Sequence, residues 1–402
     1  MELAKAGGGK VKTMSRLTVL VVGVAVAALT AALAGSVTPV HSAPVLPQGF
    51  TNGPPFVSGL TNPTDMEFAP DGRLFITEDA GRVRIAKPDG TLSTFLDIST
   101  KVESSPGERG LLALTFDPGF ATNHYLYLHY TRKATSTTPP HNRVVRFTAN
   151  GDKAVSGSEK LIFRLGNQTA ATQFMGGALD FGIDGKLYVA TGDDGGHPEK
   201  AQKLTNLFGK ILRIDKSGTI PTDNPFYSKA SGNNRAIWAL GLRNPFKFAI
   251  QPGMSTIFIN DVGQNTWEEI NMGAPGANYG WPVHEGEAKD LPYMDPILAY
   301  GHGSTDTTGC AITGGAFYNP ATLQFPQEYE GDYFFADFCG GWIRRLEQQP
   351  PSSSGFTASG FATGLQRPID LEVSKAGELY YLSRSITTGS PAFVGKITYA
   401  GT

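Results

Sequence analysis

A short phrase repeats along the chain and constrains its fold more than any other feature. In this phrase an apolar residue is followed by a glycine-containing turn and then by a short apolar run, as in Phe181 to Ala190. Such a phrase predicts a tight β-turn that leads into a buried strand. Further copies, some of them looser, begin at residues 68, 116, 250, 329 and 373. The six copies lie 44 to 79 residues apart, at or above the roughly 40 to 50 residues typical of one propeller blade.

The segments between these copies also indicate short strands. Runs such as Leu74–Thr77, Arg82–Ala86 and Thr94–Ile98 are separated by two- or three-residue turns, which is the pattern of a β-meander. No long amphipathic helical period appears after the first residues, which disfavours an α/β fold. The sequence therefore predicts an all-β chain: a six-bladed β-propeller of four-stranded antiparallel blades over residues 57–402, some with long loops.

The N-terminal residues have a different character. Lys10, Lys12 and Arg16 precede an apolar run from Leu17 to Gly35, which predicts a signal peptide over residues 1–42 with cleavage before Ala43. The alternative is a retained membrane anchor, since the run approaches the roughly 20 residues that span a bilayer. Residues 43–56 are expected to form a Pro-rich lead-in to the propeller. The chain is thus expected to be secreted, periplasmic or extracellular, with a membrane contact only through an uncleaved N-terminal segment.

Charge and cysteine content narrow the class of partner. Without residues 1–42, the remaining residues carry a net charge of −5, so no basic surface is available to neutralise the phosphates of a nucleic acid. The chain contains two cysteines, Cys310 and Cys339. In an exported chain such a pair most often forms a disulfide; two buried thiols or half of a metal site are weaker alternatives.

Several motifs together resemble the glucose/sorbosone dehydrogenase family, the soluble sugar dehydrogenases that use pyrroloquinoline quinone (PQQ). The likeness covers roughly residues 57–399. They are Gly107–Leu112, Gly176–Leu179, Leu240–Pro245, Asp261–Asn271, Asn278–Pro282 and Ile312–Gly315. The resemblance implies a six-bladed propeller with the quinone over its central channel, and a reaction in which the C1 hydroxyl of an aldose is oxidised.

The resemblance also assigns roles to single residues. A histidine of the family removes the hydroxyl proton, and its position here is Phe174, which cannot accept a proton. Arg243 matches an arginine beside the quinone carbonyl, where a fixed cation stabilises developing negative charge. Asn244 and Arg367 match further quinone contacts. A cofactor lysine falls at or near Cys339, and a second arginine falls at Ile369. The alternative for Arg243 and Asn244 is an Arg-Asn-Pro turn that only fixes a loop.

A calcium requirement follows from the same resemblance. Gly263 and Gln264 match residues whose backbone carbonyls hold the quinone-linked Ca²⁺, a hard cation that prefers oxygen ligands. Glu269 matches a carboxylate in a separate calcium site. Without the resemblance, Glu268 and Glu269 are an ordinary solvated pair of charges.

Other polar and aromatic residues are weaker candidates. Asp193, Asp194 and His197 lie in a Gly-rich loop and could supply an acid, a base or a metal ligand, although such loops usually serve as turns. His302 is either a surface or a packed histidine. Trp267 and Trp281 could line a sugar pocket or pack in the core.

Three hypotheses remain open. The first is a Ca²⁺-dependent, PQQ-type sugar dehydrogenase with a sugar substrate and an unknown electron acceptor. The second is a non-catalytic propeller that binds a carbohydrate or a protein, and Phe174 is the feature that separates it from the first. The third is a Ca²⁺-dependent lactonase-type hydrolase that uses Asp193 and Asp194.

Overall fold

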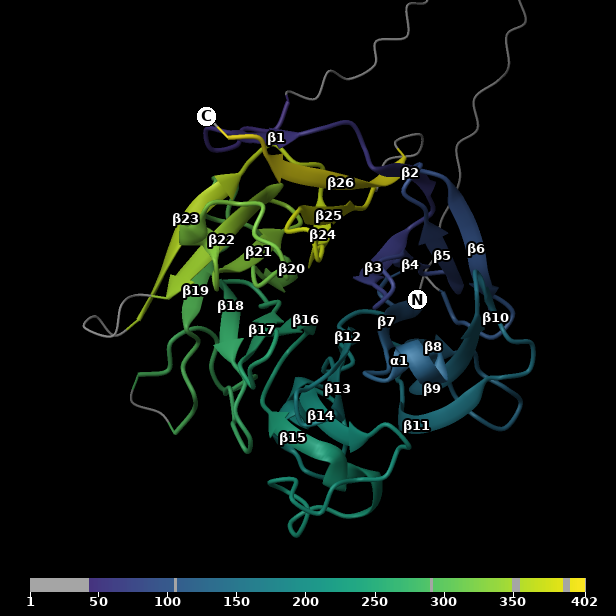
Figure 1. Cartoon of the computed structure of the whole chain (residues 1–402). Coiled ribbons are helices and arrows are strands. Elements are labelled where there is room, and N and C mark those ends of the chain that lie inside the picture. Colours follow the sequence, from purple (N-terminus) through teal and green to yellow (C-terminus); the bar gives the residue numbers. More distant parts are fainter. Residues whose placement is uncertain (1–42, 105–106, 290–291, 349–354, 386–390, 402) are drawn as a thin grey trace, which may run out of the picture. The chain divides into compact units, whose positions relative to one another are not determined.

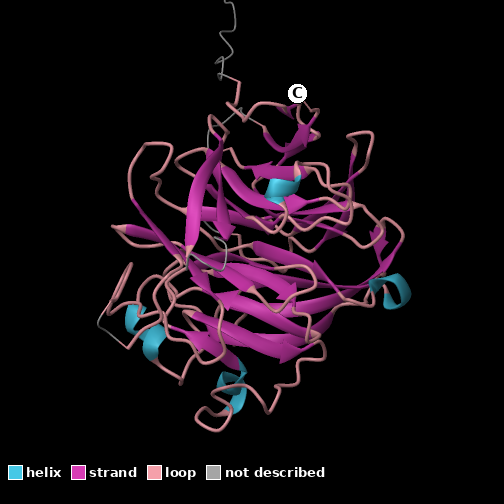
Figure 2. Cartoon of the chain, turned by 60° about the vertical axis from the view of Figure 1, so that its left-hand side comes forward, coloured by secondary structure: helices cyan, strands magenta, loops and turns pink. Residues whose placement is uncertain are grey.

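A computed structural model of the chain describes residues 43–104, 107–289, 292–348, 355–385 and 391–401. By its internal contacts the chain divides into two units, Met1–His41 and Ser42–Thr402. The predicted leader over residues 1–42 lies outside the described residues. The larger unit consists of strands and loops with a few single-turn helices (Figure 1, Figure 2).

The strands form six small antiparallel sheets, and in four of them the strands pair in chain order. The first three sheets are β3 (Pro63–Phe68), β4 (Leu74–Glu78), β5 (Arg82–Ala86) and β6 (Leu92–Asp97); β7 (Leu111–Phe116), β8 (Tyr125–Arg132), β9 (His141–Asn150), β10 (Lys153–Ala154) and β11 (Lys160–Asn167); and β12 (Gly176–Phe181), β13 (Lys186–Thr191), β14 (Lys210–Asp215) and β15 (Ile237–Leu240). The last three are β16 (Pro245–Ile250), β17 (Ile257–Asp261), β18 (Trp267–Met272) and β19 (Leu298–Gly301); β20 (Ile312–Phe317), β21 (Tyr333–Asp337), β22 (Trp342–Gln348) and β23 (Phe356–Ala362); and β24 (Pro368–Val373), β25 (Leu379–Ser383) and β26 (Ala392–Tyr399) with β1 (Phe50–Asn52) and β2 (Val57–Leu60).

Four short helices lie in the described loops. They are α1 (Phe120–Asn123), η1 (Pro198–Gln202), η2 (Gly232–Ala236) and η3 (Gln327–Tyr329). Among the described residues, none of the helices has the length and apolar character needed to cross a membrane.

The six sheets close into a ring. The first strand of each sheet contacts the first strand of the next, in the cycle β3, β7, β12, β16, β20, β24 and back to β3. We call these six the inner strands, and Figure 1 shows them around the centre of the ring. The prediction of an all-β, six-bladed propeller with four-stranded antiparallel blades is confirmed.

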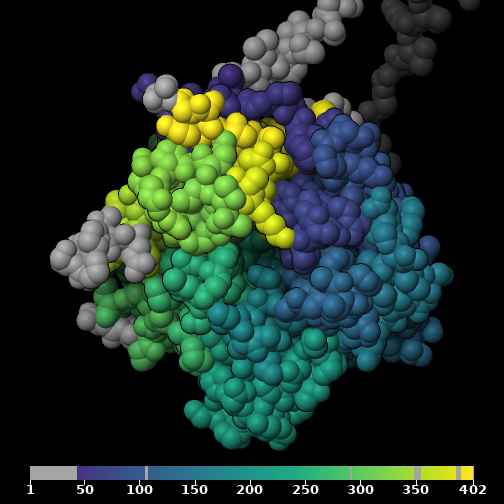
Figure 3. All heavy atoms as spheres, in the orientation of Figure 1, coloured from purple at the N-terminus to yellow at the C-terminus, as the bar shows by residue number. Residues whose placement is uncertain are grey.

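Strands from both ends of the described chain close the sixth sheet. β26 pairs with β25 on one side, and on its other side it pairs with both β1 and β2. Phe50 lies opposite Tyr399, and Val57 lies opposite Val394. Figure 3 shows the first described residues, in purple, against the last ones, in yellow. The segment 43–56, expected as a lead-in, therefore holds the strand β1.

The repeated phrase of the sequence corresponds to the hairpin between the first and second strands of a sheet. In the third sheet, for example, Phe181 ends β12, the turn at Gly185 has a φ of +69°, and Leu187 lies in β13. A positive φ favours glycine, which explains the residue's fixed place in the phrase. The copy that begins at residue 329 is different, because the loop 318–332 separates β20 from β21.

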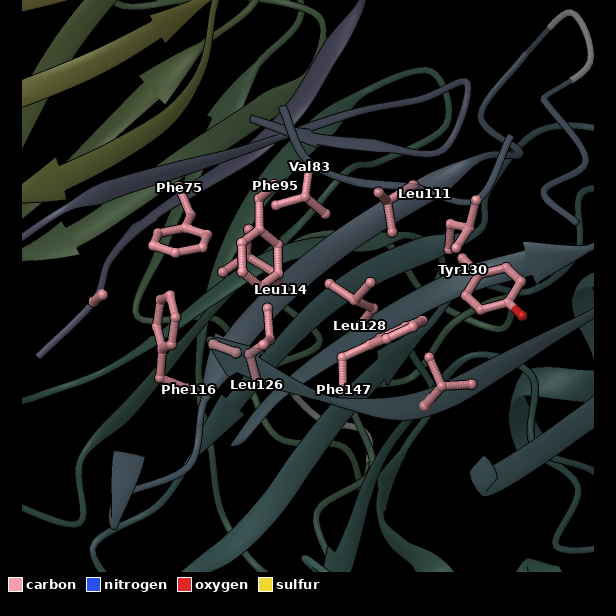
Figure 4. Close-up of a cluster of buried hydrophobic side chains, with 14 of the residues drawn as sticks. Phe75, Val83, Phe95, Leu111, Leu114, Phe116, Leu126, Leu128, Tyr130 and Phe147 are labelled. Atoms are coloured by element: carbon pink, nitrogen blue, oxygen red, sulfur yellow. The ribbon is translucent and has the colours of Figure 1, made fainter. Parts of the chain in front are cut away.

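Apolar side chains fill the space between neighbouring sheets. Between the first and second sheets the cluster includes Phe75, Phe95, Phe116 and Leu128, each at most 5% exposed (Figure 4). The Phe75 ring meets those of Phe95 and Phe116 edge to face, at centroid distances of 5.1 and 5.0 Å. Such contacts stabilise a core beyond the burial of area alone. Each sheet therefore packs both of its faces, which is what holds the blades at fixed angles.

Replacement of Phe50 tests the closure of the ring. Its ring lies 4.7 Å from that of Phe325 and 5.0 Å from that of Phe361, across the joint between β1 and the fifth sheet. We expect Phe50→Ala to lower the free energy of unfolding by about 3–5 kcal/mol, because a large buried side chain is lost. Chemical denaturation measures this change. Val45→Ala is the control, since Val45 is 69% exposed, and equal stability of the two variants would show that β1 does not close the ring.

Candidate functional site

The inner strands begin at one end of the ring, which we call the axial mouth. Hydrogen bonds join the starts of these strands: Thr64 Oγ1 donates to the Leu111 carbonyl at 2.7 Å, and Thr313 Oγ1 donates to the Pro368 carbonyl at 2.7 Å. Four residues lie within three positions before the first residue of an inner strand. They are Glu108, Phe174, Asn244 and Arg367. Ring closure thus brings residues from four different sheets to one end of the molecule.

Arg243 and Asn244 are held in place by one buried carboxylate. Asp261, at the end of β17, accepts hydrogen bonds from the backbone N–H groups of Arg243 at 3.0 Å and Asn244 at 2.7 Å. Burial, reinforced by the nearby Glu269, raises the pKa of Asp261 well above its ordinary value. The Asn244 side chain accepts from the Gly176 N–H at 2.8 Å and so ties β16 to β12. The Arg-Asn-Pro turn therefore fixes a loop and also directs its two side chains to the mouth.

The Arg243 guanidinium lies between an aromatic ring and two carbonyl groups. Its Nη1 donates to the carbonyls of Val262 at 3.0 Å and Gly263 at 2.5 Å, and its carbon lies 3.8 Å from the centroid of the Phe174 ring. The Trp281 ring lies 5.5 Å away. Within the described part of the chain, Nε and Nη2 of this guanidinium have no hydrogen-bond acceptor. A fixed cation with two unused donors remains available to a ligand.

Phe174 has an unusual backbone conformation. Its φ is +60°, which is rare for a bulky residue and costs on the order of 1–2 kcal/mol. Its carbonyl accepts a hydrogen bond from the Asp194 N–H at 3.2 Å, and a Cβ on Gly192 would lie 1.9 Å from the same oxygen. The surrounding loops therefore impose this backbone, while the side chain supplies only a surface for the Arg243 cation.

Gly263, Gln264 and Glu269, which were expected to hold calcium, all have hydrogen-bond partners within the protein. The Gly263 carbonyl already accepts from Arg243, and the Gln264 N–H donates to Glu285 Oε1 at 2.6 Å. Glu269 accepts from the Gly286 N–H at 2.6 Å and from Asn271 Nδ2 at 3.0 Å, and burial raises its pKa to about 7. In the described ranges no group of three or more His, Cys, Asp or Glu side chains could hold a metal ion.

Two of the weaker candidates join the site. Trp281 donates through its indole N–H to Asp193 Oδ2 at 2.8 Å, and the Asp193 N–H donates to the Arg243 carbonyl at 2.8 Å. Burial raises the pKa of Asp193 above its ordinary value. Asp194 accepts from the Thr169 N–H at 3.0 Å and pairs with Lys200 at 3.3 Å. These contacts give Asp193 and Asp194 structural partners.

The other weaker candidates lie elsewhere. The His197 side chain is 52% exposed and lies 3.8 Å from Glu199. His302 pairs with the fully buried Glu268 at 2.8 Å, and burial raises the pKa of Glu268 to about 9. Trp267 is 38% exposed and its ring covers Gly286. None of these three candidates has a hydrogen bond or ion pair to Arg243 or Asn244 within the described residues.

The far side of the mouth holds Arg367 and the disulfide. The Arg367 guanidinium lies 5.2 Å from the Phe338 ring, and no described residue forms an ion pair with it. Cys310, before β20, is bonded to Cys339, after β21, as the sequence predicted. Ile369, where the family has a second arginine, is buried in an apolar cluster.

Two groups of functional residues were missed by the sequence reasoning. The first is Glu108, which was noted only as part of a motif; its Oε2 accepts from Asn244 Nδ2 at 3.1 Å and the Met175 N–H at 3.2 Å. The second is a set of charged residues on inner strands: Lys247 pairs with Asp65 at 2.5 Å and Asp370 at 2.8 Å. Charged residues two positions apart in the otherwise apolar strand Pro63–Phe68 were the available signal.

This charged set continues toward the other end of the ring. A cavity of about 330 Å³ is lined there by Glu67, Asp180, Lys247 and Glu372, among others. Burial raises the pKa of Asp180 to about 6 and that of Asp370 to about 7. The centre of the propeller thus contains more carboxylates than cations, in surroundings that favour their protonated forms.

The chain is similar to known proteins of one family. A family model described as Glucose / Sorbosone dehydrogenase matches residues 60–387. Quinoprotein glucose dehydrogenase B from Acinetobacter calcoaceticus is 30% identical over 261 residues, which cover 59% of this chain and 53% of that protein. Hedgehog-interacting protein from Mus musculus is 32% identical over 227 residues, which cover 51% of this chain and 32% of that protein. The chain spans about half of the length of most curated relatives that it matches.

A solved structure agrees with the fold. The soluble aldose sugar dehydrogenase from Escherichia coli, in its apo form, superposes with a TM-score of 0.74 at 26% sequence identity. The superposition covers 87% of this chain and 99% of that chain. The likeness therefore extends over nearly the whole ring.

The pKa of Asp180 predicts how stability depends on pH. Because the folded-state pKa is about 6 and the ordinary value is 3.8, the folded chain keeps a proton that the unfolded chain releases in this range. The stability contributed by the protonated group is therefore lost as the pH rises from about 4 to about 6. We expect Asp180→Asn to flatten this loss and to be more stable than the parent at pH 7 by on the order of 1–3 kcal/mol.

Denaturant unfolding at several pH values measures this effect. The control is Asp306→Asn, since Asp306 lies on an exposed loop. An identical pH dependence for the parent and Asp180→Asn would show that Asp180 is ionised in the folded chain.

Proposed function

Because the chain belongs to the glucose/sorbosone dehydrogenase family, we propose that its axial mouth binds an aldose sugar together with PQQ and oxidises the sugar at C1. The observation that supports this proposal is the Arg243 guanidinium, which is fixed by neighbouring residues yet keeps two donors unused. A cation held in this way stabilises negative charge on an oxygen that is being reduced. When bound, the quinone would supply a carbonyl that accepts a hydride.

The residues present fit part of this cofactor. PQQ carries three carboxylates, and the unpaired guanidinium groups of Arg243 and Arg367 are suited to carboxylate and carbonyl oxygens. The positions of a cofactor lysine and a second arginine do not contribute, because Cys339 is in a disulfide and Ile369 is buried. We therefore infer that the chain would hold PQQ through fewer charges than the family pattern implies.

Calcium does not fit the present arrangement of the mouth. The Gly263 carbonyl, a proposed ligand, is occupied by the Arg243 guanidinium at 2.5 Å. A cation at that carbonyl would also lie beside the positive charge of Arg243, which disfavours it. No step of the proposed reaction is therefore assigned to Ca²⁺.

The contact between Phe174 and Arg243 favours a second candidate function. An aromatic ring 3.8 Å from the guanidinium leaves no imidazole at the place where the family has its base. A chain with this substitution could keep a carbohydrate or protein ligand at the mouth without oxidising it. One of the relatives, Hedgehog-interacting protein from Mus musculus, is named for an interaction and not for an oxidation. Export of the chain stays a prediction.

Reconstitution of the full chain with PQQ separates the two functions. We expect aldose-dependent reduction of a dye acceptor when the purified chain is supplied with PQQ, with or without added Ca²⁺. Steady-state dye bleaching over a panel of aldoses is the measurement. Saturable sugar binding by calorimetry with no dye reduction would favour the non-catalytic function instead.

Substitution of Arg243 tests the residue that supports the proposal. We expect Arg243→Gln to lower kcat by about 100-fold or more, which is the usual cost of removing a donor that stabilises transition-state charge. Arg235→Gln is the matched control, because Arg235 is exposed and lies against Tyr227. Equal kcat values for both variants would remove Arg243 from the mechanism.

A further inference from the structure

The proposed oxidation needs a group that accepts the hydroxyl proton, and Phe174 cannot be that group. Both carboxylate oxygens of Asp261 already accept the backbone N–H groups of Arg243 and Asn244, so three other ionisable side chains at this end of the ring come into question. Asp193 is 2% exposed, with both carboxylate oxygens in hydrogen bonds to Trp281 and the Gly195 N–H. His129 is fully buried and borders neither of the two small cavities at this end of the ring. Glu108 is half-buried and borders one of them.

Glu108 lies where three sheets meet. It precedes β7, and its carboxylate accepts hydrogen bonds from the Met175 N–H, next to Phe174, and from the Asn244 side chain. The carboxylate is thus one hydrogen bond away from the residue that follows Arg243. A base at this point lies beside the backbone of residues 174 and 175, the segment that carries the missing histidine in the family pattern.

The surroundings of Glu108 favour proton uptake. Burial raises its pKa above the ordinary value, although hydrogen bonds from Met175, Phe174 and Asn244 and the charge of Arg243 act in the opposite direction. A base works best when its pKa is shifted toward the operating pH. The charge of Arg243 opposes this rise in pKa and is the smallest of these influences.

Glu108 lines a small cavity that could receive the proton. This cavity has a volume of about 30 Å³, enough for about two water molecules, and Asp65, Lys247, Arg384 and Glu108 are among its lining residues. Lys247 also lines the cavity of about 330 Å³ that contains Glu67 and Asp180 near the other end of the inner strands. Ionisable groups therefore follow one another from Glu108 along the inside of the ring.

We propose that Glu108 takes the proton of the sugar C1 hydroxyl in place of the missing histidine and releases it into the cavity of about 30 Å³ that it lines. In this step the O–H bond would break and its proton would bind the Glu108 carboxylate, while a bound quinone would supply the carbonyl that accepts the hydride from C1. This inference rests on the proposed function. Asp65, Lys247 and Arg384 are charged groups that line the same cavity as Glu108, and the charge of Arg243 lowers the pKa of Glu108.

Glu108→Gln tests the inference in the full chain supplied with PQQ. The amide keeps an oxygen that can accept from Met175 and Asn244, but it cannot take a proton. We expect kcat to fall by about 100-fold or more with KM changed by less than about threefold, and the acid side of the pH profile to disappear. Glu330→Gln is the matched control on an exposed turn, and absorbance titration with PQQ together with thermal unfolding confirms binding and folding of each variant.

Phe174→His, alone and combined with Glu108→Gln, completes the experiment. Restoration of kcat by Phe174→His in the Glu108→Gln background supports the inference, because an imidazole at that position replaces the lost base. Parent-like kcat in Glu108→Gln overturns the inference and leaves the proposed function intact. Activity in Phe174→His with none in the parent chain also overturns it. If neither the parent nor Phe174→His oxidises any aldose, the proposed function fails and the inference fails with it.

Discussion

Closure of the ring by backbone hydrogen bonds is the constraint on which the rest of the structure depends. β26 bonds to β25 on one side and to β1 and β2 on the other, so the two ends of the described chain complete one sheet. Once the ring is closed, the inner strands can contact one another only in a cycle. Glu108, Phe174, Asn244 and Arg367 belong to segments far apart in the sequence, and they share one mouth because each precedes an inner strand.

The mouth has a fixed backbone, but position 174 lacks the ionisable side chain of the family pattern. Asp261 fixes the backbone of Arg243 and Asn244, and the loops impose a positive φ on Phe174. Strained backbone of this kind concentrates at functional sites. The side chain at position 174 supports the Arg243 cation from one face but has no proton to exchange. The fixed geometry agrees with the proposed oxidation, in which Glu108 takes the proton.

The sequence was sufficient for the fold because the repeated hairpin is a local signal. The turn at Gly185 and its copies each have an apolar residue before them and a buried strand after them, within about ten residues. β1 was not predicted, because Phe50–Asn52 becomes a strand only through pairing with Tyr399 and its neighbours at the other end of the chain. The copy that begins at residue 329 leads into β21 but does not form a tight hairpin with β20, because the long loop 318–332 separates the two strands.

The family motifs supplied the candidate site residues. Arg243, Asn244 and Arg367 were named through the resemblance and stay predictions, whereas the disulfide expected from the cysteine count is present. The roles of Glu108 and Lys247 depend on contacts between sheets, which a single sequence does not contain.

A crystal structure of the chain with PQQ and a sugar tests the central claim most directly. The account predicts quinone density at the axial mouth, with its oxygens within hydrogen-bonding distance of Arg243 Nε or Nη2 and with Glu108 near the sugar C1 hydroxyl. Density elsewhere on the ring, or an Arg243 guanidinium that contacts only Phe174, Val262 and Gly263 in the presence of saturating PQQ, would contradict it.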